Sequence, residues 1–349
     1  MKNIKFFYPN GNLLHPTTGG EIYDNNLYNQ LKIDKDLKIE VIHGNGSKFK
    51  TLKNFFKTLK ESSKDEVIFI NSRICTRILP VLFYNKVFGK KKIYIIHHHF
   101  AYQENKGLKM IILKFIEECT LRLSNKIVSP NPYVVDCIKK VCPEKKICFI
   151  GHPFEHKLKN SSKYEHYKLL FVGTIYYRKG IDLLLESLNK LPILIKSKLS
   201  LNLVGNIIDD EYFKLLKDKI IKFDLEKQVK FIGRVSAARL NELYRESYCF
   251  ILPSRHEGYG LVIEEAMSYG LPVIAFDNSA MPYTIKSDYN GILVKDGDVA
   301  SLSSAIEKIV TDGNLHKTLC NGALESYSKS HDILDFQEEV GLLIHSMKN

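Results

Sequence analysis

Two carboxylates, Glu257 and Glu265, stand eight residues apart in a glycine-containing stretch of the chain, Pro253–Ile274. Gly258 and Gly260, between them, allow backbone conformations that other residues avoid. A helix is expected after Gly260, and it would point free N–H groups and the positive end of its dipole back at the loop, which suits a diphosphate. One carboxylate could then reach a sugar and the other a ribose of the same ligand. Each glutamate taken alone would fit an ordinary strand-helix unit with acidic surface residues.

A second candidate site lies in Leu170–Gly180, with the sequence LFVGTIYYRKG. An apolar run ends at Gly173, and the basic pair Arg178 and Lys179 opens the next helix-like segment. Cations in that position could neutralise charge that develops on a departing diphosphate. An isolated Arg-Lys pair at a helix start would otherwise be read as solvated.

A pair of glycines, Gly19 and Gly20, follows the first apolar run of the chain and precedes a helix-like segment. Such a pair allows the backbone to approach a ligand closely. By itself it is weak support for a site, because most such pairs form turns.

Three adjacent histidines, His97 to His99, end another apolar run. Neighbouring side chains in a strand point in different directions, so they rarely bind one metal ion. The pair Asp209 and Asp210 stands at a helix start and is typical of a cap. The sequence therefore predicts no metal site.

Short apolar runs alternate with longer amphipathic segments in the first part of the chain, which is typical of a doubly wound parallel sheet. The alternation breaks at the polar stretch His152–Tyr167, which we interpret as a linker between domains. Strands are expected at Ile4–Tyr8, Ile39–Ile42, Glu66–Ile70, Ile93–Ile96, Lys126–Ser129 and Ile147–Ile150.

After the linker the alternation resumes, and it predicts a second domain of the same class. Expected strands are Leu169–Val172, Leu201–Val204, Val229–Ile232, Cys249–Leu252 and Pro272–Ala275. Expected helices are Ile181–Leu191, Asp209–Phe223, Ala237–Glu246 and Leu261–Tyr269, with a helical pattern again from His316 onward.

The predicted fold is α/β, with two Rossmann-like doubly wound parallel-sheet domains. We assign residues 1–158 to a first domain and residues 159–325 to a second, and expect a helix in residues 326–349 to pack back on the first domain. Ligands of such sheets bind at the carboxyl ends of the strands, so a cleft between the two domains is the expected site.

The stretch Pro253–Ile274 resembles the E-x7-E region of family 4 retaining glycosyltransferases, glycosyl transferases group 1, with the E-G-[FY]-G-L…E-A-M…G-x-P-V-I pattern nearly complete. The resemblance implies the GT-B fold, with two domains facing a cleft, residues 1–158 on the acceptor side and residues 159–325 binding the nucleotide sugar. It implies that Glu257 contacts hydroxyls of the donor sugar and that Glu265 holds the ribose hydroxyls. It also places the donor-binding loop at Gly258, Tyr259, Gly260, Leu261 and Val262.

Other segments resemble the same family. Gly173 and Lys179 match its G-R-x-x-x-K-G motif, but Thr174 stands where the family has arginine, and Arg178 could supply that cation because guanidinium suits phosphate. The G-G loop at Gly19 and Gly20 would approach the diphosphate and acceptor. The family has a histidine near the donor sugar, and it corresponds to His97 or else His98. The family segment that meets the nucleobase corresponds to Phe231–Val235, with Arg234 and Val235. The family's N-G-x-L-V turn corresponds to Asn290–Val294.

The resemblance implies a retaining enzyme that moves a hexose-type sugar from a nucleotide diphosphate to a glycan or lipid-linked acceptor, in cell-surface polysaccharide synthesis. No cofactor is expected besides the donor. A GT-B nucleotide-sugar epimerase is one alternative, because a fold does not fix a function. A nucleic-acid binder is another, suggested by the net charge of +12. We expect no nucleic-acid partner, since no nucleic-acid motif occurs and tryptophan is absent.

The composition bears on location. The seven cysteines include no C-x-x-C spacing, which favours a reducing cytoplasm over a disulfide framework. No run of about 18 apolar residues occurs, so no transmembrane helix is expected. Residues 47–60 predict a lysine-rich amphipathic helix with Leu52, Phe55, Phe56 and Leu59 on one face. That helix could lie on an anionic membrane surface, making the enzyme peripheral on the inner face. Alternatively, it packs that face on its own sheet.

Overall fold

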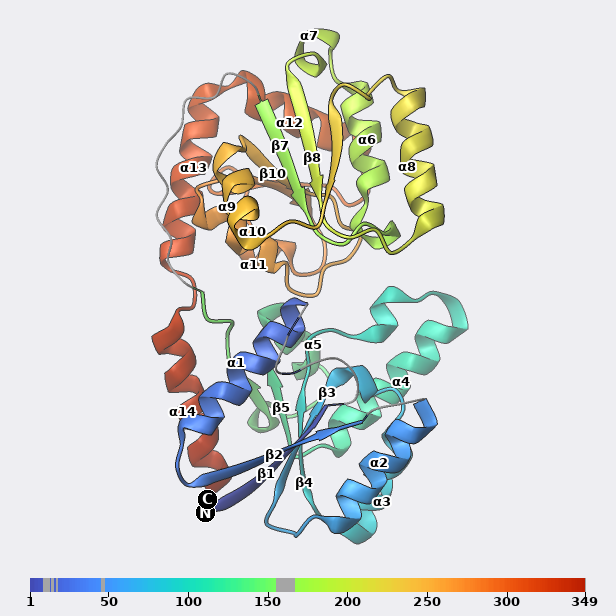
Figure 1. Ribbon diagram of the computed structural model, residues 1–349, viewed down its shortest axis with the longest axis vertical. Coiled ribbons are helices and arrows are strands. Elements are labelled where there is room, and N and C mark those ends of the chain that lie inside the picture. Colours follow the sequence, from blue (N-terminus) through green and yellow to red (C-terminus); the bar gives the residue numbers. More distant parts are fainter. Residues whose placement is uncertain (9–12, 14–15, 17, 45–47, 155–166, 349) are drawn as a thin grey trace. The chain divides into compact units, whose positions relative to one another are not determined.

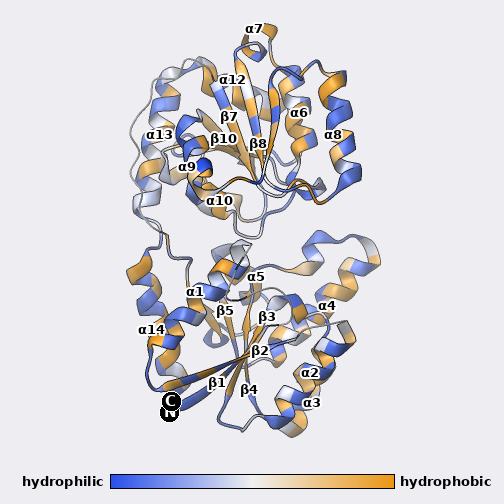
Figure 2. Ribbon diagram, in the orientation of Figure 1, coloured by the Kyte–Doolittle hydropathy of each residue, from blue (hydrophilic) through white to orange (hydrophobic). Residues whose placement is uncertain are grey.

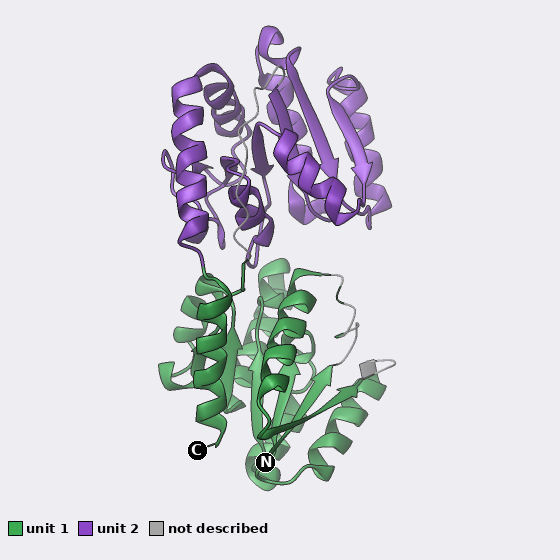
Figure 3. Cartoon of the chain, turned by 60° about the vertical axis from the view of Figure 1, so that its left-hand side comes forward, with its two compact units in different colours: residues 1–154, 331–349 green, residues 155–330 purple. Residues whose placement is uncertain are grey.

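The computed structural model describes residues 1–8, 13, 16, 18–44, 48–154 and 167–348. The chain forms two compact units, and Figure 3 distinguishes them by colour. Unit 1 comprises residues 1–154 and 331–349, and unit 2 comprises residues 155–330. The expected division after residue 325 falls inside a helix, α13 (Gly313–Ser328), so the chain leaves unit 2 a few residues later than expected. Residues 155–166 of the expected linker lie outside the described residues.

Unit 1 is built on a six-stranded sheet with the order β2-β1-β3-β4-β5-β6, and every pairing is parallel. The central strand β3 is buried at all five positions, as expected where helices cover both faces of a sheet. All six strands coincide with the expected ones to within two residues. Their bounds are β1 (Lys2–Tyr8), β2 (Leu37–His43), β3 (Val67–Asn71), β4 (Lys92–Ile96), β5 (Lys126–Ser129) and β6 (Ile147–Phe149).

The helices of unit 1 cover the two faces of this sheet (Figure 1). Tyr23 and Leu27 of α1 pack with Phe336 and Val340 of α14 in one core. Phe55 of α2 belongs to the other core. The helices are α1 (Gly19–Ile33), α2 (Lys48–Glu61), α3 (Leu79–Tyr84), α4 (Gly107–Leu123), α5 (Pro132–Lys139) and α14 (Ile333–Lys348), with short turns η1 (Ser72–Ile74), η2 (Asn85–Gly89), η3 (Ala101–Glu104) and η4 (Glu144–Lys146).

The chain returns to unit 1 through α14. The helical pattern expected from His316 onward forms two helices, because the helical conformation is interrupted between α13 and α14 at residues 329–332. The ammonium of Lys348 pairs with Asp34 at 3.1 Å and with Asp36 at 2.8 Å, both after α1. The last helix is thus part of the core of unit 1 and is also held at its end by charge.

Unit 2 repeats the architecture, with a sheet of order β12-β11-β10-β7-β8-β9 in which every pairing is again parallel. The prediction of two doubly wound parallel sheets is therefore confirmed. The strands are β7 (Tyr167–Val172), β8 (Leu199–Val204), β9 (Val229–Gly233), β10 (Cys249–Leu252), β11 (Val273–Phe276) and β12 (Gly291–Val294).

One expectation for unit 2 is wrong. The segment Asn290–Val294, expected to be a turn, contains the edge strand β12. Gly291 lies so close to β11 that a Cβ atom there would stand 2.3 Å from the carbonyl oxygen of Val273. The turn-like pair Asn290-Gly291 spans the start of the strand, because Gly291, which has no side chain, can lie directly against β11.

The helices of unit 2 lie along both faces of its sheet, and Figure 2 shows the hydrophobic colour concentrated on the strands. Buried apolar residues from α6 and α12, such as Leu184 and Ile306, fill the core. The remaining elements are η5 (Tyr177–Lys179), α6 (Ile181–Lys190), α7 (Ile193–Lys196), α8 (Asp210–Lys222), α9 (Ala237–Glu246), α10 (Leu261–Ser268), α11 (Met281–Thr284), α12 (Val299–Thr311) and α13.

The expected amphipathic helix is α2, but its apolar face points inward. Phe55 is 0% exposed and Leu59 is 1% exposed, and both belong to the core of unit 1, with Leu52 and Phe56 packed against it. The stripe that was expected to rest on a bilayer therefore covers the sheet, and that prediction is wrong for this helix. Among the described helices, none has both the length and the apolar character needed to span a bilayer.

Candidate active site

The carboxylate of Glu257 and the ammonium of Lys179 form a buried ion pair in unit 2. Lys179 Nζ donates to Oε1 at 2.6 Å and to Oε2 at 3.0 Å. The guanidinium of Arg178 donates to Oε2 at 3.1 Å. Glu257 is 6% exposed and Lys179 is 8% exposed. The two candidate motifs of the second half of the chain, far apart in sequence, therefore meet in one cluster.

The charges in this cluster set the state of Glu257. Burial on its own would raise its pKa, but the charges of Lys179 and Arg178, and the hydrogen bonds that both donate, hold the pKa below its ordinary value. Glu257 is therefore an anion at neutral pH. Because it faces two cations, the cluster keeps an excess of positive charge, which favours an anionic ligand.

Gly180 brings the two motifs together. Its φ is 66°, and a Cβ atom at this position would stand 1.9 Å from the carbonyl oxygen of Pro253. Next to this contact, the backbone N–H of Arg255 donates to the carbonyl of Arg178 at 2.8 Å. The loop before α6 and the loop after β10 can pack backbone against backbone only because residue 180 has no side chain.

A second ion pair, between Arg255 and Asp182, fastens the same two loops. Arg255 donates twice, to Oδ1 at 2.9 Å and to Oδ2 at 2.6 Å, and its guanidinium lies 3.9 Å from the ring centre of Tyr177. The hydroxyl of Tyr212 also donates to Asp182, at 2.6 Å. This pair was not predicted from the sequence. The available signal was a residue of opposite charge beside each motif, Asp182 just after Lys179 and Arg255 just before Glu257.

The helix α10 begins directly after the loop that carries Glu257. Gly260 precedes it with φ 82°, and no side chain caps this end of the helix. In the first turn the N–H of Ile263 donates to the carbonyl of Gly260 at 2.7 Å, whereas the N–H groups of Leu261 and Val262 are directed at the loop and available to a ligand. Gly258 and Tyr259, between Glu257 and the helix, are half-buried.

The second carboxylate of the motif, Glu265, is exposed on α10, and its Oε2 accepts a hydrogen bond from the buried hydroxyl of Tyr244 at 2.9 Å. The hydroxyl of Tyr244 therefore orients an exposed carboxylate. Its neighbour Glu264 differs, since burial raises its pKa to about 7. Our sequence analysis gave Glu264 no role.

The other donor-site candidates of unit 2 follow the carboxyl ends of β7 and β9. Thr174 is half-exposed, and a Cβ atom on its neighbour Gly173 would lie 3.5 Å from Lys179 Nζ, an ordinary contact distance, so this turn lies against the Lys179 side chain. Arg234 is exposed and Val235 half-buried after β9. These residues lie at the edge of the sheet where ligands of parallel sheets bind.

Unit 1 gathers its candidates at the carboxyl ends of β1, β3 and β4. Gly19 begins α1, and a Cβ atom on Gly20 would lie 3.6 Å from the ring of His98. Nε2 of His98 is 2.8 Å from Oδ1 of Asp24, which is fully buried. Because a carboxylate only accepts hydrogen bonds, Nε2 carries a proton, and in a neutral ring Nδ1 is then an acceptor.

The adjacent His97 lies in different surroundings. It is fully buried and stacks edge-on with Phe100 at 4.5 Å, and burial lowers its pKa to about 3. Of the two histidines, His98 is the one with polar partners. We therefore take His98 forward as the candidate, although His97 was the nearer match in sequence.

Polar residues that our sequence analysis missed surround His98. Asp24 accepts from Asn71 Nδ2 at 2.5 Å through its other oxygen. The exposed Arg73 donates to Glu21 at 2.8 Å, and Glu21 forms a capping box with Thr18 at the start of α1. A sequence signal existed only in the position of Asn71 and Arg73, which follow the apolar run 67–70.

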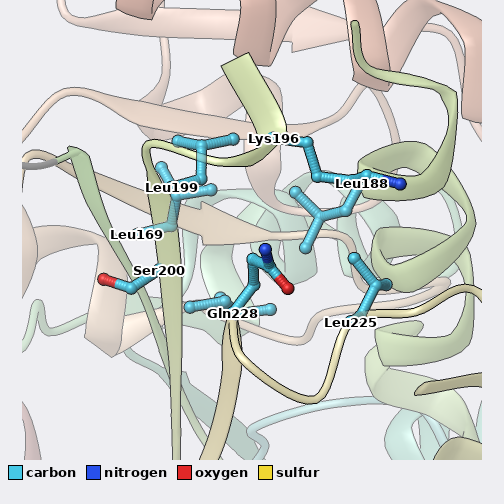
Figure 4. Close-up of a pocket in the computed structure, with 8 residues that line it drawn as sticks. Leu169, Leu188, Lys196, Leu199, Ser200, Leu225 and Gln228 are labelled. Atoms are coloured by element: carbon cyan, nitrogen blue, oxygen red, sulfur yellow. The ribbon is translucent and has the colours of Figure 1, made fainter. Parts of the chain in front are cut away.

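Within the described part of the chain, no three His, Cys, Asp or Glu side chains gather in a way that could hold a metal ion. A narrow gap with no room for a water molecule lies in unit 2 among Leu169, Leu188, Leu199 and Leu225, near the amino ends of β7 and β8 (Figure 4). It is lined mainly by leucines and lies at the edge of the sheet opposite Lys179. We attribute this gap to imperfect packing.

Comparison with known proteins agrees with this fold. Sucrose-phosphate synthase from Thermosynechococcus elongatus superposes with a TM-score of 0.82 at 17% identity, over 100% of this chain and 99% of the other. Anabaena HepE, solved in complex with UDP-glucose, superposes with a TM-score of 0.75 at 16% identity, over 99% and 100%. The two parallel sheets and these neighbours define a GT-B protein.

Sequence similarity gives the family. Residues 154–325 match the model of glycosyl transferases group 1, and the chain belongs to that family. An uncharacterized 41.2 kDa protein in the cps region of Klebsiella pneumoniae is 28% identical over 257 residues, 69% of this chain and 68% of that protein. The O-antigen chain mannosyltransferase B of Escherichia coli is 30% identical over 145 residues, 41% of this chain and 36% of that protein.

Proposed function

We propose that this chain transfers a hexose from a nucleoside diphosphate sugar to a glycan or lipid-linked acceptor, with retention of the anomeric configuration. The observation that carries the proposal is the cluster of Glu257, Lys179 and Arg178 beside the uncapped start of α10. An anion between two cations, next to a helix N-terminus, can hold a sugar hydroxyl and a diphosphate at once.

Each group of the cluster has a role in this proposal. Lys179, Arg178 and the N–H groups that begin α10 bind the diphosphate and stabilise the charge that develops as the bond from its oxygen to the sugar breaks. Glu257 accepts hydrogen bonds from sugar hydroxyls and positions the ring. The acceptor oxygen bonds to the anomeric carbon from the face that the diphosphate leaves, and its proton passes to the leaving diphosphate.

We propose that unit 1 binds the acceptor. His98 offers Nδ1 as a hydrogen-bond acceptor while Asp24 fixes its ring, and Arg73 lies among the surrounding polar groups. These groups can order hydroxyls of an incoming glycan. Synthesis of a cell-surface polysaccharide is supported by the similarity to the O-antigen chain mannosyltransferase, and a nucleotide-sugar donor by the UDP-glucose complex of HepE. We place the reaction in the cytoplasm, where the seven cysteines, all free, would stay reduced.

Donor screening and product analysis test the proposal. Thermal-shift measurements with UDP-, GDP- and ADP-sugars should identify a donor that stabilises the protein, and that donor should be hydrolysed slowly without an acceptor. Proton NMR of the first product should show the anomeric configuration of the donor. An inverted product would overturn retention, and the absence of any stabilising or hydrolysed nucleotide sugar would overturn the transferase.

We expect Glu265→Gln to weaken nucleotide binding by about tenfold while changing turnover at saturating donor by less than about threefold. The ribose is remote from the reacting bond, so contacts to it act on binding and transition state alike. Calorimetric titration with the nucleotide and steady-state kinetics measure the two effects. Tyr244→Phe, which removes only the hydroxyl that orients Glu265, should give a smaller effect in the same direction. A turnover defect with unchanged binding would contradict the ribose assignment.

We expect activity to survive EDTA, because two cations and a helix N-terminus are available to hold the diphosphate in unit 2. The measurement is the transfer rate in metal-free buffer, with and without added Mg²⁺ or Mn²⁺. A loss that either ion specifically restores would show that a metal ion shares the role assigned to Lys179 and Arg178.

A further inference from the structure

The first half of α4 in unit 1 presents its hydrophobic side chains to solvent. Leu108, Ile111, Ile112 and Phe115 are 72%, 59%, 49% and 65% exposed. Their spacing of i, i+3, i+4 and i+7 places them along one face of the helix. We call these four residues the α4 stripe. Hydrophobic colour runs along this helix in Figure 2.

The opposite face of α4 is held against unit 1 by polar groups. Glu117 is 1% exposed and accepts hydrogen bonds from the backbone N–H groups of Ala101 and Tyr102, both at 3.0 Å. Thr120 is fully buried and donates to the carbonyl of Cys75 at 2.9 Å. These bonds fix the rotation of the helix about its axis, so the stripe cannot turn inward without breaking them. A surface helix ordinarily has the reverse arrangement.

Positive charge flanks the α4 stripe. Lys106, Lys109 and Lys114 are exposed, and no acidic residue lies between Lys106 and Glu117. Arg122 lies seven residues after Phe115, on the same side of the helix. Its carbonyl accepts a hydrogen bond from Lys146 at 2.7 Å. Lys146 is one of five lysines that line a concavity of about 560 Å³, together with Lys86, Lys90, Lys91 and Lys145.

We propose that the α4 stripe is a membrane-docking surface that inserts into the headgroup region of a bilayer containing anionic lipids. An apolar stripe flanked by lysines matches the interface of such a bilayer, because the side chains leave water while the ammonium groups stay at the level of the phosphates. A symmetric contact with a second copy fits less well, since it would bring the flanking lysines of both copies together. The proposal does not depend on the chemistry assigned to unit 2.

The absence of tryptophan from the chain provides a direct test. Phe115→Trp introduces a single fluorophore on the stripe. Phe49→Trp is a matched control, because Phe49 is 78% exposed and flanked by lysines on α2. With vesicles of phosphatidylcholine and phosphatidylglycerol, emission of Phe115→Trp should shift to the blue, and that of Phe49→Trp should not. Absence of a shift in the stripe variant, or equal shifts in both, would overturn the proposal.

Vesicle sedimentation tests the same surface without a fluorophore. Ile112→Gln with Phe115→Gln should lower the partition coefficient on the anionic vesicles at least about tenfold, and Phe49→Gln should change it by less than about twofold. Lys109→Glu with Lys114→Glu should lower binding to anionic vesicles and abolish its salt dependence. Equal binding of the wild type to pure phosphatidylcholine would overturn the electrostatic part. A wild-type dimer that the glutamine pair dissociates, without vesicle binding, would assign the stripe to a second copy instead.

Discussion

Glu257→Gln should reduce kcat/KM for sugar transfer by at least about a thousandfold, a loss of roughly 4 kcal/mol of transition-state stabilisation. The amide keeps the size of the side chain but loses its charge and one acceptor position. Sugar hydroxyls then lose a charge-assisted partner, and Lys179 and Arg178 lose the anion that orients them at 2.6 and 3.1 Å. Steady-state kinetics with a saturating acceptor measure the effect.

The glutamine variant is preferable to alanine because Lys179 is buried. Removing the carboxylate outright would leave an ammonium that is 8% exposed without its partner, and such a change costs about 3–5 kcal/mol of folding free energy. Glu257→Gln with Lys179→Met removes both charges and serves as the control for stability. If Glu257→Gln retains more than about a tenth of wild-type kcat/KM with a normal melting temperature, the role of Glu257 in transfer is wrong.

The ion pair between Glu257 and Lys179 also predicts how folding stability changes with pH. The folded-state pKa of Glu257 lies below the ordinary value of 4.5, so its contribution is fully present above that value and is lost as pH falls through the folded-state pKa. Denaturant unfolding at a series of acidic pH values should therefore show a steeper decline for the wild type than for Glu257→Gln. Equal slopes would mean that the ion pair contributes nothing to folding.

The sheets were predictable from sequence because both are parallel and buried on both faces. Their strands are short apolar runs, as in β3, where every residue is buried, and such runs stand out between amphipathic helices. The strand β12 was not predicted because its four residues begin with the glycine of an Asn-Gly pair that is typical of a turn. The neighbour that makes β12 a strand, β11, is a tertiary contact that no local pattern contains.

The donor motifs were predictable residue by residue, but their connections were not. The sequence indicates Lys179 and Glu257 separately, whereas the ion pair that joins them depends on a backbone contact between Gly180 and Pro253. Similarly, neighbouring residues at the end of a strand face opposite ways, and the sequence does not say which. The fold buries His97 and gives His98 the carboxylate of Asp24.

The helices α2 and α4 show the same limit on a larger scale. Both have apolar residues at helical spacing with lysines beside them, so periodicity predicts an amphipathic helix in each. Whether the apolar face of such a helix points inward or outward depends on whether the residues of its other face can be buried. In α2 that face is lysine-rich and must stay in water, whereas in α4 Glu117 and Thr120 find buried hydrogen-bond partners and the stripe is left outside.

Gly180→Ala should lower the melting temperature of unit 2 sharply and reduce kcat/KM by at least about a hundredfold. Two costs add. The φ of 66° is unfavourable for any residue with a Cβ atom, by roughly 1–2 kcal/mol, and the new methyl would stand 1.9 Å from the carbonyl oxygen of Pro253. Because that oxygen belongs to the backbone, the loops themselves must separate. Arg255 would then lose its hydrogen bond to the carbonyl of Arg178, and Glu257 would move away from Lys179.

Gly297→Ala isolates the first cost from the second. Gly297 has a similar φ of 70°, but no atom lies within 4 Å of the position that its Cβ would occupy. Chemical denaturation of both variants should therefore show a loss of roughly 1–2 kcal/mol for Gly297→Ala and a clearly larger loss for Gly180→Ala. Transfer activity should be near normal in the first and strongly reduced in the second. Equal effects of the two substitutions would mean that the contact between Gly180 and Pro253 does not hold the Lys179–Glu257 pair together.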